Sequence, residues 1–287
     1  STTRLNHLVI NKLAKYNKLA PLHNPVNLVC IKKSWELFPQ IDQYAIFDTA
    51  YYRTLPDYIF RYALPEKLYT EYGIRRYGFH GISHEYAALE GSKKAKINFS
   101  KAKIITCHLG SGCSMTATKD GKALSTTMGF TPLEGLMMST RSGDIDPSIP
   151  LFLINEGLSP EEGDGILNRQ SGLLGVANTR DMREILLASG EKVAGYKTEK
   201  KFSASEKEKA KLALKMFVYN IVRYAGQFKA VMKGLDLVVF TGGIGERSLA
   251  LRKLVLKEIK SLGRFKSVVI SANEELMIAR EIKKKLK

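Results

Sequence analysis

Residues 235–246 read Leu-Asp-Leu-Val-Val-Phe-Thr-Gly-Gly-Ile-Gly-Glu, a buried strand that runs directly into a glycine turn. The residues after it repeat apolar side chains at helical spacing, with Leu249, Leu254 and Ile259 on one face. A strand, a glycine turn and a helix in this order are typical of a nucleotide-binding corner in an α/β protein, because glycines let the backbone approach phosphate closely. The spacing matches neither a Walker loop nor the dinucleotide fingerprint, so its chemistry must come from other residues.

A second glycine corner is expected earlier in the chain. Residues 103–107 form an apolar strand that continues into His108-Leu109-Gly110-Ser111-Gly112, and Asp120-Gly121 then predicts a hairpin turn. Backbone N–H groups exposed by these glycines can point at phosphate oxygens. Any tight turn also uses glycine, so this corner is a weak signal when taken alone.

The remaining elements are predicted from periodicity and turn residues. The chain opens with a helix, breaks at the two prolines of residues 20–25 and continues as a short apolar strand. Ser159-Pro160-Glu161-Glu162 has the pattern of a helix start, and residues 206–232 form a long helix with one core-facing side. A strand at 44–47 and a last strand at 267–271 complete the α/β pattern.

Charged and hydrogen-bonding side chains stand where strands end or loops begin. The strand at 44–47 delivers Asp48 and the last strand delivers Glu274, although such an acid also serves as a helix N-cap. Loops at 75–84 and 129–147 are too polar and interrupted for core elements and present the candidates His80 and Arg141, to which the first glycine corner adds His108. Phosphoryl transfer needs this set, because the protein must align two substrates, hold Mg²⁺ on carboxylate oxygen and neutralise a planar phosphoryl group.

Composition limits the class of protein. With 287 residues and 44% hydrophobic content the chain is globular, and its length suits two domains. No stretch has the length of a membrane span, which makes the cytoplasm the default location. The three cysteines, Cys30, Cys107 and Cys113, have no disulfide or zinc spacing and are read as reduced structural thiols. The net charge of +17 gathers in lysine-rich stretches such as 197–211 and is better explained by a solvated surface than by nucleic-acid binding.

These segments closely resemble the motifs of one enzyme family and keep its order along essentially the whole chain. The matching segments are Ala-Pro-Leu-His-Asn-Pro (20–25), Phe-Asp-Thr-Ala (47–50), Arg-Arg-Tyr-Gly-Phe-His-Gly-Ile-Ser-His (75–84), Gly-Phe-Thr-Pro-Leu-Glu-Gly-Leu-Met-Met (129–138), Thr-Arg-Ser-Gly-Asp-Ile-Asp-Pro (140–147), Phe-Thr-Gly-Gly-Ile-Gly-Glu (240–246) and Asn-Glu-Glu-Leu-Met-Ile-Ala-Arg (273–280). The chain therefore resembles the acetate kinases, and more closely than the wider superfamily of sugar kinases, heat-shock ATPases and actin.

The resemblance implies a two-domain, actin-like ATPase fold of the ribonuclease H-like type, with the first domain incomplete. Residues 1–50 and 273–287 would be the remnant of that domain, and residues 51–272 the second, nucleotide-binding domain. The family's opening strand and its Asn-Ala-Gly-Ser-Ser-Ser phosphate loop are expected to be missing, since Ser1-Thr2-Thr3 resembles residues that follow them. Ser111 and Arg247 stand where the family usually has Asn.

The resemblance also implies roles for single residues. Arg141 and His80 would stabilise the phosphoryl group in flight, Asp48 would be the catalytic aspartate with His23 as its partner, and Glu274 would hold Mg²⁺ or Mn²⁺. The substrate methyl group would lie in a pocket that includes Leu22, Phe79 and Pro132. ATP or ADP would be held by two loops and an adenosine segment, which contain His108, Leu109, Gly110, Ser111 and Gly112; Gly243, Ile244, Gly245, Glu246 and Arg247; and Asp181, Met182 and Arg183.

The expected activity is reversible phosphoryl transfer from ATP to acetate, which gives acetyl phosphate and ADP, in a cytoplasmic homodimer. Propionate is a second candidate acceptor, because one methylene in a small pocket changes binding by only about 1 to 3 kcal/mol. The competing hypothesis is a truncated, non-catalytic homologue that binds a nucleotide or a protein partner. Nucleic-acid binding through the lysines is the third, and no interleaved aromatic and basic motif supports it.

Overall fold

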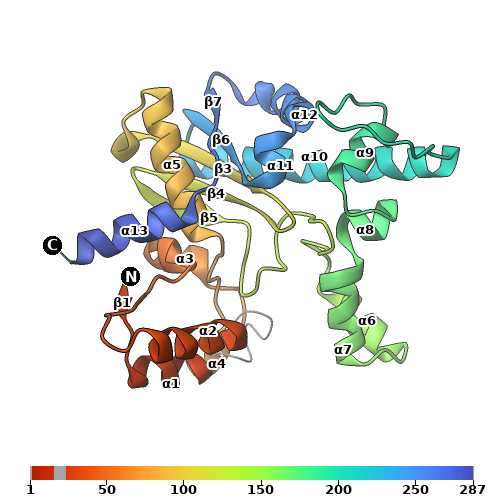
Figure 1. Ribbon diagram of the computed structural model, residues 1–287. Helices are drawn as coiled ribbons and strands as arrows, with labels where there is room; N and C mark the ends of the chain where they lie inside the picture. The colour runs from red at the N-terminus through yellow and green to blue at the C-terminus, as the bar shows by residue number, and fades with distance from the viewer. Residues whose placement is uncertain (1, 16–23, 287) are drawn as a thin grey trace.

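A mixed β-sheet flanked by helices forms the centre of the molecule (Figure 1). The computed structural model describes residues 2–15 and 24–286. Within these residues the sheet has the strand order β5-β4-β3-β6-β7. The pairs β3–β6 and β6–β7 are parallel, whereas β3–β4 and β4–β5 are antiparallel. The strands are β3 (Lys103–Leu109), β4 (Cys113–Lys119), β5 (Lys122–Thr126), β6 (Leu237–Thr241) and β7 (Lys266–Val269).

Both faces of this sheet are covered, which explains why β3, β4 and β6 are buried along nearly their whole length. Helix α5 (Gly81–Ala95) packs on one face, where alternate residues such as Ile104 and Val239 point. Helices α10 (Ala204–Met232) and α12 (Leu249–Ile259) cover the other face, which holds the larger core. The result is a three-layer α/β arrangement in which loops at the strand ends are the exposed functional parts.

Shorter elements surround these layers. Helices α1 and α2 pack on each other below the sheet in the view of Figure 1, and β1 pairs with β2 in an antiparallel ladder. The elements are β1 (Thr3–Arg4), α1 (His7–Lys15), α2 (Asn24–Leu37), β2 (Tyr44–Ala45), η1 (Ala50–Thr54), α3 (Asp57–Phe60), α4 (Glu66–Tyr72), η2 (Phe99–Lys101), α6 (Ser148–Asn155), α7 (Pro160–Gly165), the π-helical η3 (Ile166–Gln170), α8 (Gly172–Ala177), α9 (Met182–Ala188), α11 (Gly242–Arg247), η4 (Lys260–Leu262) and α13 (Glu274–Lys285).

Several local predictions are confirmed. The Asp120–Gly121 turn joins β4 to β5 in an antiparallel hairpin, and the long helix runs to Met232 as expected. At the start of α7 the side chain of Ser159 accepts from the backbone N–H of Glu162, whose carboxylate accepts from the backbone of Ser159. Capping residues and hydrophobic spacing were sufficient here, because both act within one or two turns of chain.

One predicted element is wrong. The short strand expected after residues 20–25 is the helix α2, which begins at Asn24 and runs to Leu37. Pro25 lies in its first turn, where the missing N–H has no intrahelical partner to lose, so the proline begins this helix instead of preventing it. The strand expected at 44–47 is also shorter, because β2 ends at Ala45.

The C-terminal helix α13 packs against α5. Met277 is buried in the core beneath α5, and Arg280 forms an ion pair of 2.7 Å with Glu90. The segment assigned by sequence to the first unit is thus in direct contact with the second. The proposed division at residues 50 and 273 stays a prediction.

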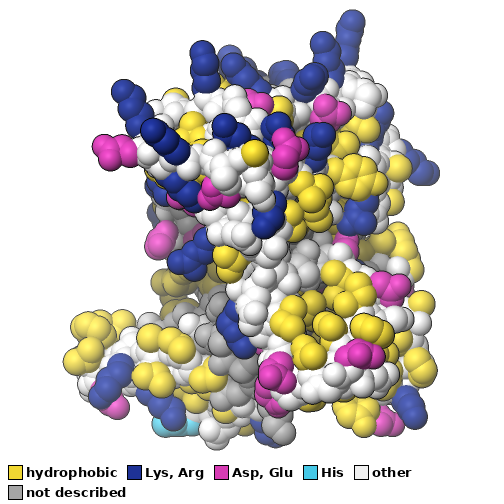
Figure 2. All heavy atoms as spheres, turned by 90° about the vertical axis from the view of Figure 1, so that its right-hand side faces the viewer, with side chains coloured by type: hydrophobic (Ala, Val, Ile, Leu, Met, Phe, Trp, Pro, Cys, Tyr) yellow, Lys and Arg dark blue, Asp and Glu magenta, His cyan; other side chains and the backbone are white. Residues whose placement is uncertain are grey.

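The surface is mixed in character. Figure 2 shows Lys and Arg side chains that project from its upper part and are interspersed with acidic ones, while hydrophobic side chains gather lower down. Helix α6 contributes Leu151 and Phe152, which are 63% and 61% exposed. None of the helices in the described parts of the chain has both the length and the apolar character that a membrane span requires.

Candidate functional site

The two glycine corners meet at one edge of the sheet. Strands β3 and β6 are parallel, with His108 opposite Thr241, so the loops that follow them leave in the same direction. A Cβ placed on Gly110 would lie 3.9 Å from the backbone nitrogen of Gly243 and 3.8 Å from Nε2 of His108. The structure therefore brings together the two corners that were predicted separately.

Helix α11 begins immediately after β6. Gly242 makes this turn at φ +76°, and a Cβ on it would lie 2.8 Å from the carbonyl oxygen of Leu109. Arg252 donates to the carbonyls of Gly245 at 2.7 Å and Glu246 at 2.6 Å, which satisfies the C-terminal end of α11. The corner is thus held against β3 with its glycine backbone close to the neighbouring loop.

Asp48 lies against the start of α5. Its carboxylate accepts the backbone N–H of His80 at 2.5 Å and of Ile82 at 3.3 Å, and its carbonyl accepts that of Gly81 at 2.9 Å. Burial raises the pKa of Asp48, an effect that these N–H donors and the nearby His108 oppose in part. Asp48 therefore binds the N-terminal end of α5 and lies next to His80, while its catalytic role stays a prediction.

His80 stands between Asp48 and the first glycine corner. It adopts the left-handed conformation at φ +57° and forms the N-cap position of α5. Its ring is stacked on that of His108, with centroids 4.3 Å apart, and its Nδ1 lies 2.9 Å from Oγ of Ser114. Burial, and after it the charge that His80 carries when protonated, lower the pKa of His108 to about 3, so His108 is a neutral ring at physiological pH.

Arg141 reaches the same place from a different loop. A Cβ on Gly112 would lie 3.5 Å from Nη1 of Arg141 and 3.3 Å from Nε2 of His80, so both side chains flank this glycine. Nη1 also donates to the carbonyl of Pro132 at 3.3 Å. Burial lowers the pKa of Arg141, and no carboxylate of the described residues lies within 4.0 Å of its guanidinium.

The loop that carries Arg141 is fixed by its backbone. Ser139 N–H donates to the carbonyl of Ser111 at 3.2 Å, which fastens this loop to the first glycine corner. Thr140 accepts from Ser171 at 3.0 Å, and Ser142 donates to Leu167 at 3.0 Å. Because these bonds tie it to two other segments, the guanidinium is held in place before any ligand arrives.

Glu274 begins helix α13 and faces the same region. Burial raises its pKa first, followed by the negative charges of Asp48 and Glu275. The charge of Asp48 therefore disfavours ionisation of Glu274, so the two carboxylates interact electrostatically. Glu246 steadies the approach to α13, because its Oε1 accepts the backbone N–H of Ala272 at 2.9 Å.

Two acids that the sequence did not single out support the site. Asp144 accepts the backbone N–H of Gly135 at 2.8 Å and the hydroxyl of Tyr224 at 2.6 Å, and it forms an ion pair with Arg223. Glu134 in turn is bound by Tyr62 and Arg76. Both lie in the quoted motifs, yet their side-chain partners are 58 to 80 positions away in sequence, so no local signal could assign them.

The segment expected to border the adenosine makes most of its polar contacts within residues 181–183. Asp181 is the N-cap of α9, accepts the backbone N–H of Arg183 at 2.8 Å and forms an ion pair with its guanidinium at 2.6 Å. That guanidinium also lies 4.6 Å from the ring centroid of Tyr196. Met182 is only 3% exposed and packs in the main core, so its side chain does not face solvent.

The methyl-group pocket is only partly visible. The carbonyl of Phe79 accepts the hydroxyl of Tyr52 at 2.9 Å, next to His80, and Pro132 contacts Arg141. Leu22 and His23 lie outside the described residues. The structure thus places Phe79 next to His80 and Pro132 against Arg141, and the methyl-group pocket itself stays a prediction.

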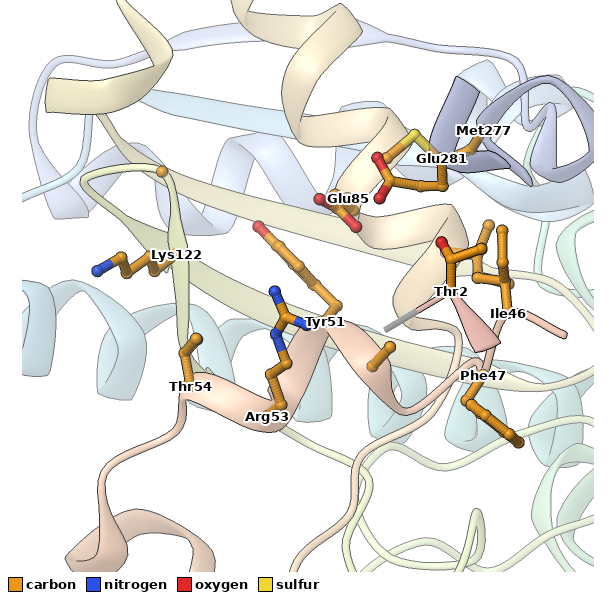
Figure 3. A pocket seen from close by; sticks show the side chains of 13 residues that line it. Thr2, Ile46, Phe47, Tyr51, Arg53, Thr54, Glu85, Lys122, Met277 and Glu281 are labelled. Carbon is orange, nitrogen blue, oxygen red and sulfur yellow. The ribbon is translucent and has the colours of Figure 1, made fainter. Parts of the chain in front are cut away.

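A separate pocket of about 220 Å³ lies beside α5, between η1 and α13 (Figure 3). Glu85 and Glu281 face one another across it, with Arg53 nearby. Burial and then the charge of Glu281 raise the pKa of Glu85, which means that the folded state holds the ionised form poorly.

Replacing Glu85 by glutamine is expected to stabilise the protein at alkaline pH. Where folding raises the pKa of a carboxyl group, the folded protein becomes less stable as pH rises through that folded-state pKa. Glutamine does not ionise, so it removes this loss of stability. Thermal melts should show a Tm at pH 8 that is higher than that of the wild type, by about 1 to 3 °C on the usual scale for a chain of this size, and equal Tm values near pH 4. An equal difference at both pH values would contradict the charge explanation.

Comparisons with known proteins identify the family of this chain. The model of the Acetokinase family matches residues 2–266. The chain is 42% identical to an acetate kinase of Carboxydothermus hydrogenoformans, covering 96% of this chain and 72% of that protein, and 40% identical to one of Methanosarcina mazei, covering 99% and 72%.

Solved structures give the same result. The crystal structure of Porphyromonas gingivalis acetate kinase matches with a TM-score of 0.88 and 36% identity, covering 100% of this chain and 74% of that one. A propionate kinase from Francisella tularensis matches with a TM-score of 0.87 and 38% identity, covering 98% and 74%. The α/β architecture is therefore the actin-like ATPase fold of these enzymes, as the sequence predicted. The chain belongs to the acetokinase family and is a phosphotransferase.

Proposed function

We propose that this protein transfers the γ-phosphoryl group of ATP to acetate, reversibly, to give acetyl phosphate and ADP. The observation that carries the proposal is the convergence of His80 and Arg141 on Gly112, next to the place where the two glycine corners meet. A phosphoryl group in transfer is planar and spreads its charge over three oxygens. A guanidinium fork and an imidazole on rigid backbone suit that charge.

The carboxylate acceptor and the phosphoryl group meet between these side chains. Arg141 and His80 stabilise charge in the transition state, and we expect them to affect kcat more than KM. Asp48 holds the backbone of His80 and Ile82, so it orients the imidazole as well as placing a negative charge beside the cleft. His23, for which the family resemblance implies a partner role, lies outside the described residues.

ATP is proposed to lie across the two glycine corners. Residues 108–112 and 243–247 offer backbone N–H groups to the phosphates, and Asp181, Met182 and Arg183 would border the adenosine. The hydroxyl of Thr241 lies between the corners, is buried and has no hydrogen-bond partner within the described part of the chain. A ligand that reaches the corner can bind this hydroxyl, which fits a phosphate-binding role.

Magnesium, or manganese, fits the carboxylate pair. The described residues contain no cluster of three or more His, Cys, Asp or Glu able to enclose a metal ion. Mg²⁺ bound with nucleotide usually takes one or two carboxylates together with phosphate oxygens, and Glu274 beside Asp48 meets that need. Held by Glu274, the ion would neutralise phosphate charge. The cation would also relieve the mutual repulsion that raises the pKa of Glu274.

A hydroxamate assay tests the activity directly. Acyl phosphate formed from ATP and acetate reacts with hydroxylamine to a coloured product, and the Arg169→Ala variant, which loses only an exposed arginine, should match the wild type. We expect acetate to be preferred and propionate to react at a lower rate, because Phe79 and Pro132 limit the pocket volume. ATP binding without acyl phosphate formation would support the non-catalytic homologue instead.

Assembly and location are proposed from the surface of α10 and the family resemblance. Helix α10 exposes Leu212, Met216 and Tyr219 along one face, at spacings of four and three residues. We propose that apolar surface of this kind is shared between two copies in a homodimer, as the family resemblance implies, and that the enzyme works in the cytoplasm, where ATP is available. Light scattering of the purified protein measures the first of these.

A further inference from the structure

Three polar side chains form a series of contacts that leads to Nδ1 of His80. Thr106 comes from β3, His84 from α5 and Ser114 from β4, and all three are fully buried. Nδ1 of His84 lies 2.6 Å from Oγ1 of Thr106, and its Nε2 lies 2.7 Å from Oγ of Ser114. The same Oγ lies 2.9 Å from Nδ1 of His80, so a continuous series of hydrogen bonds ends on the candidate catalytic ring.

The distances give this series a direction. Complete burial holds the pKa of His84 well below its usual range, so the ring is neutral and carries one proton. Its contact with Thr106, at 2.6 Å, is shorter than the roughly 2.7 to 3.2 Å of N–H···O bonds, whereas a hydroxyl group forms donated bonds to oxygen from about 2.5 Å. If His84 donated to Thr106 instead, the Thr106 hydroxyl would have to donate to the carbonyl oxygen of Thr116, which is 3.4 Å away. Thr106 is therefore the donor to Nδ1.

The proton positions follow step by step from that donor. Because Nδ1 of His84 accepts, its Nε2 carries the proton and donates to Oγ of Ser114. Ser114 has a single hydroxyl proton, and with Oγ accepting from His84 this proton is donated to Nδ1 of His80. In its neutral form His80 must then carry its proton on Nε2.

We propose that Thr106, His84 and Ser114 form a one-way hydrogen-bond relay that holds His80 in the Nε2–H tautomer, with Ser114 as its positioning residue. Nε2 is the nitrogen on the side of Gly112 and Arg141. The ring can then donate to a phosphoryl oxygen without carrying a positive charge beside the Arg141 guanidinium and the stacked ring of His108. This use of the tautomer rests on the function proposed above, whereas the relay itself does not.

Nuclear magnetic resonance of the ¹⁵N-labelled protein tests the relay without any assay of turnover. Two-bond ¹H–¹⁵N correlations distinguish the two imidazole tautomers, and a His80→Gln variant identifies the signals of that ring. We expect His80 and His84 both to carry the proton on Nε2 and to leave Nδ1 bare. A His80 ring protonated on Nδ1 overturns the proposal.

A pair of matched variants connects the tautomer to catalysis. Thr106→Val removes the first donor, whereas Thr118→Val removes an equally buried hydroxyl that is bonded to Tyr51 at 2.8 Å and to no histidine. Partners that orient a functional histidine are worth about 10- to 100-fold in activity, so Thr106→Val should lower kcat by about tenfold, with KM little changed, and should alter the histidine signals. Thr118→Val should do neither.

Serine at 114 gives a second comparison. Ser114→Ala removes the donor to Nδ1 of His80, so it should lower kcat and leave His80 as a mixture of both tautomers. Ser114→Thr keeps the hydroxyl and should show the single Nε2–H tautomer of the wild type. Equal spectra in wild type, Thr106→Val and Ser114→Ala refute the relay. A wild-type protein that shows the Nε2–H ring but forms no acyl phosphate supports the relay and refutes the proposed function.

Discussion

Replacing Arg141 by alanine is expected to lower kcat by about 10³-fold, because it removes the guanidinium that we place on the phosphoryl group in transfer. The loss should fall on kcat, with the KM values for ATP and acetate changed by less than about tenfold, since the interaction belongs to the transition state. Arg141→Lys should recover only part of the rate, because an ammonium group supplies charge without the planar fork. Steady-state kinetics with the hydroxamate assay measures all of these values.

The folding stability of the Arg141 variant separates this explanation from a structural one. No ion pair of the described residues involves Arg141, and its burial disfavours the charged form. Thermal melts should therefore show an unchanged or slightly higher Tm for Arg141→Ala. Should the variant retain full activity, or lose activity only in proportion to a lowered Tm, the assignment of Arg141 to the phosphoryl group would be abandoned.

Sequence reasoning was most reliable where the cause is local. The Asp120–Gly121 hairpin, the capping box at Ser159 and the helix ending at Met232 each depend on residues a few positions apart. The prediction at Pro25 was wrong. A proline either stops a helix or lies in the first turn of a new one, and the residues that follow decide between the two. The helix there continues for three turns past the proline, which the apolar residues alone did not reveal.

The site shows a different limit of sequence reasoning. Motif resemblance selected His80, Arg141, Asp48 and Glu274, and the structure brings the first three to one edge of the sheet with Glu274 beside Asp48. The residues that support them have partners far away in sequence. Asp144 binds Tyr224 across 80 positions, and Ser114 joins two histidines that precede it by 34 and 30. Such pairs depend on how the strands and helices are aligned in the fold. Hydrophobic patterns predict which residues are buried but not which polar side chains meet.

Gly81 shows how this site constrains the backbone, and its replacement by alanine is expected to have the second largest effect. Alanine is the better helix former by about 1 kcal/mol, so helix propensity alone predicts a gain at the start of α5. In the folded protein, however, a Cβ on Gly81 would lie 2.1 Å from the carbonyl oxygen of Asp48. Backbone atoms cannot rotate away, so either the Asp48 segment or the helix start must move.

That movement displaces both groups on which the proposed chemistry depends, because His80 precedes Gly81 and Asp48 is bonded to both. A shift of about 1 Å in a catalytic group costs on the order of 100-fold in rate, and overpacking costs about 1 to 3 kcal/mol of stability. Gly81→Ala should therefore lower kcat by about 100-fold and also lower Tm. Gly226→Ala is the matched control, since Gly226 lies inside α10 with nothing within 4 Å of its Cβ position, and it should raise Tm and leave kcat unchanged. If Gly81→Ala and Gly226→Ala changed Tm and kcat in the same way, helix propensity, and not contact with Asp48, would decide the effect.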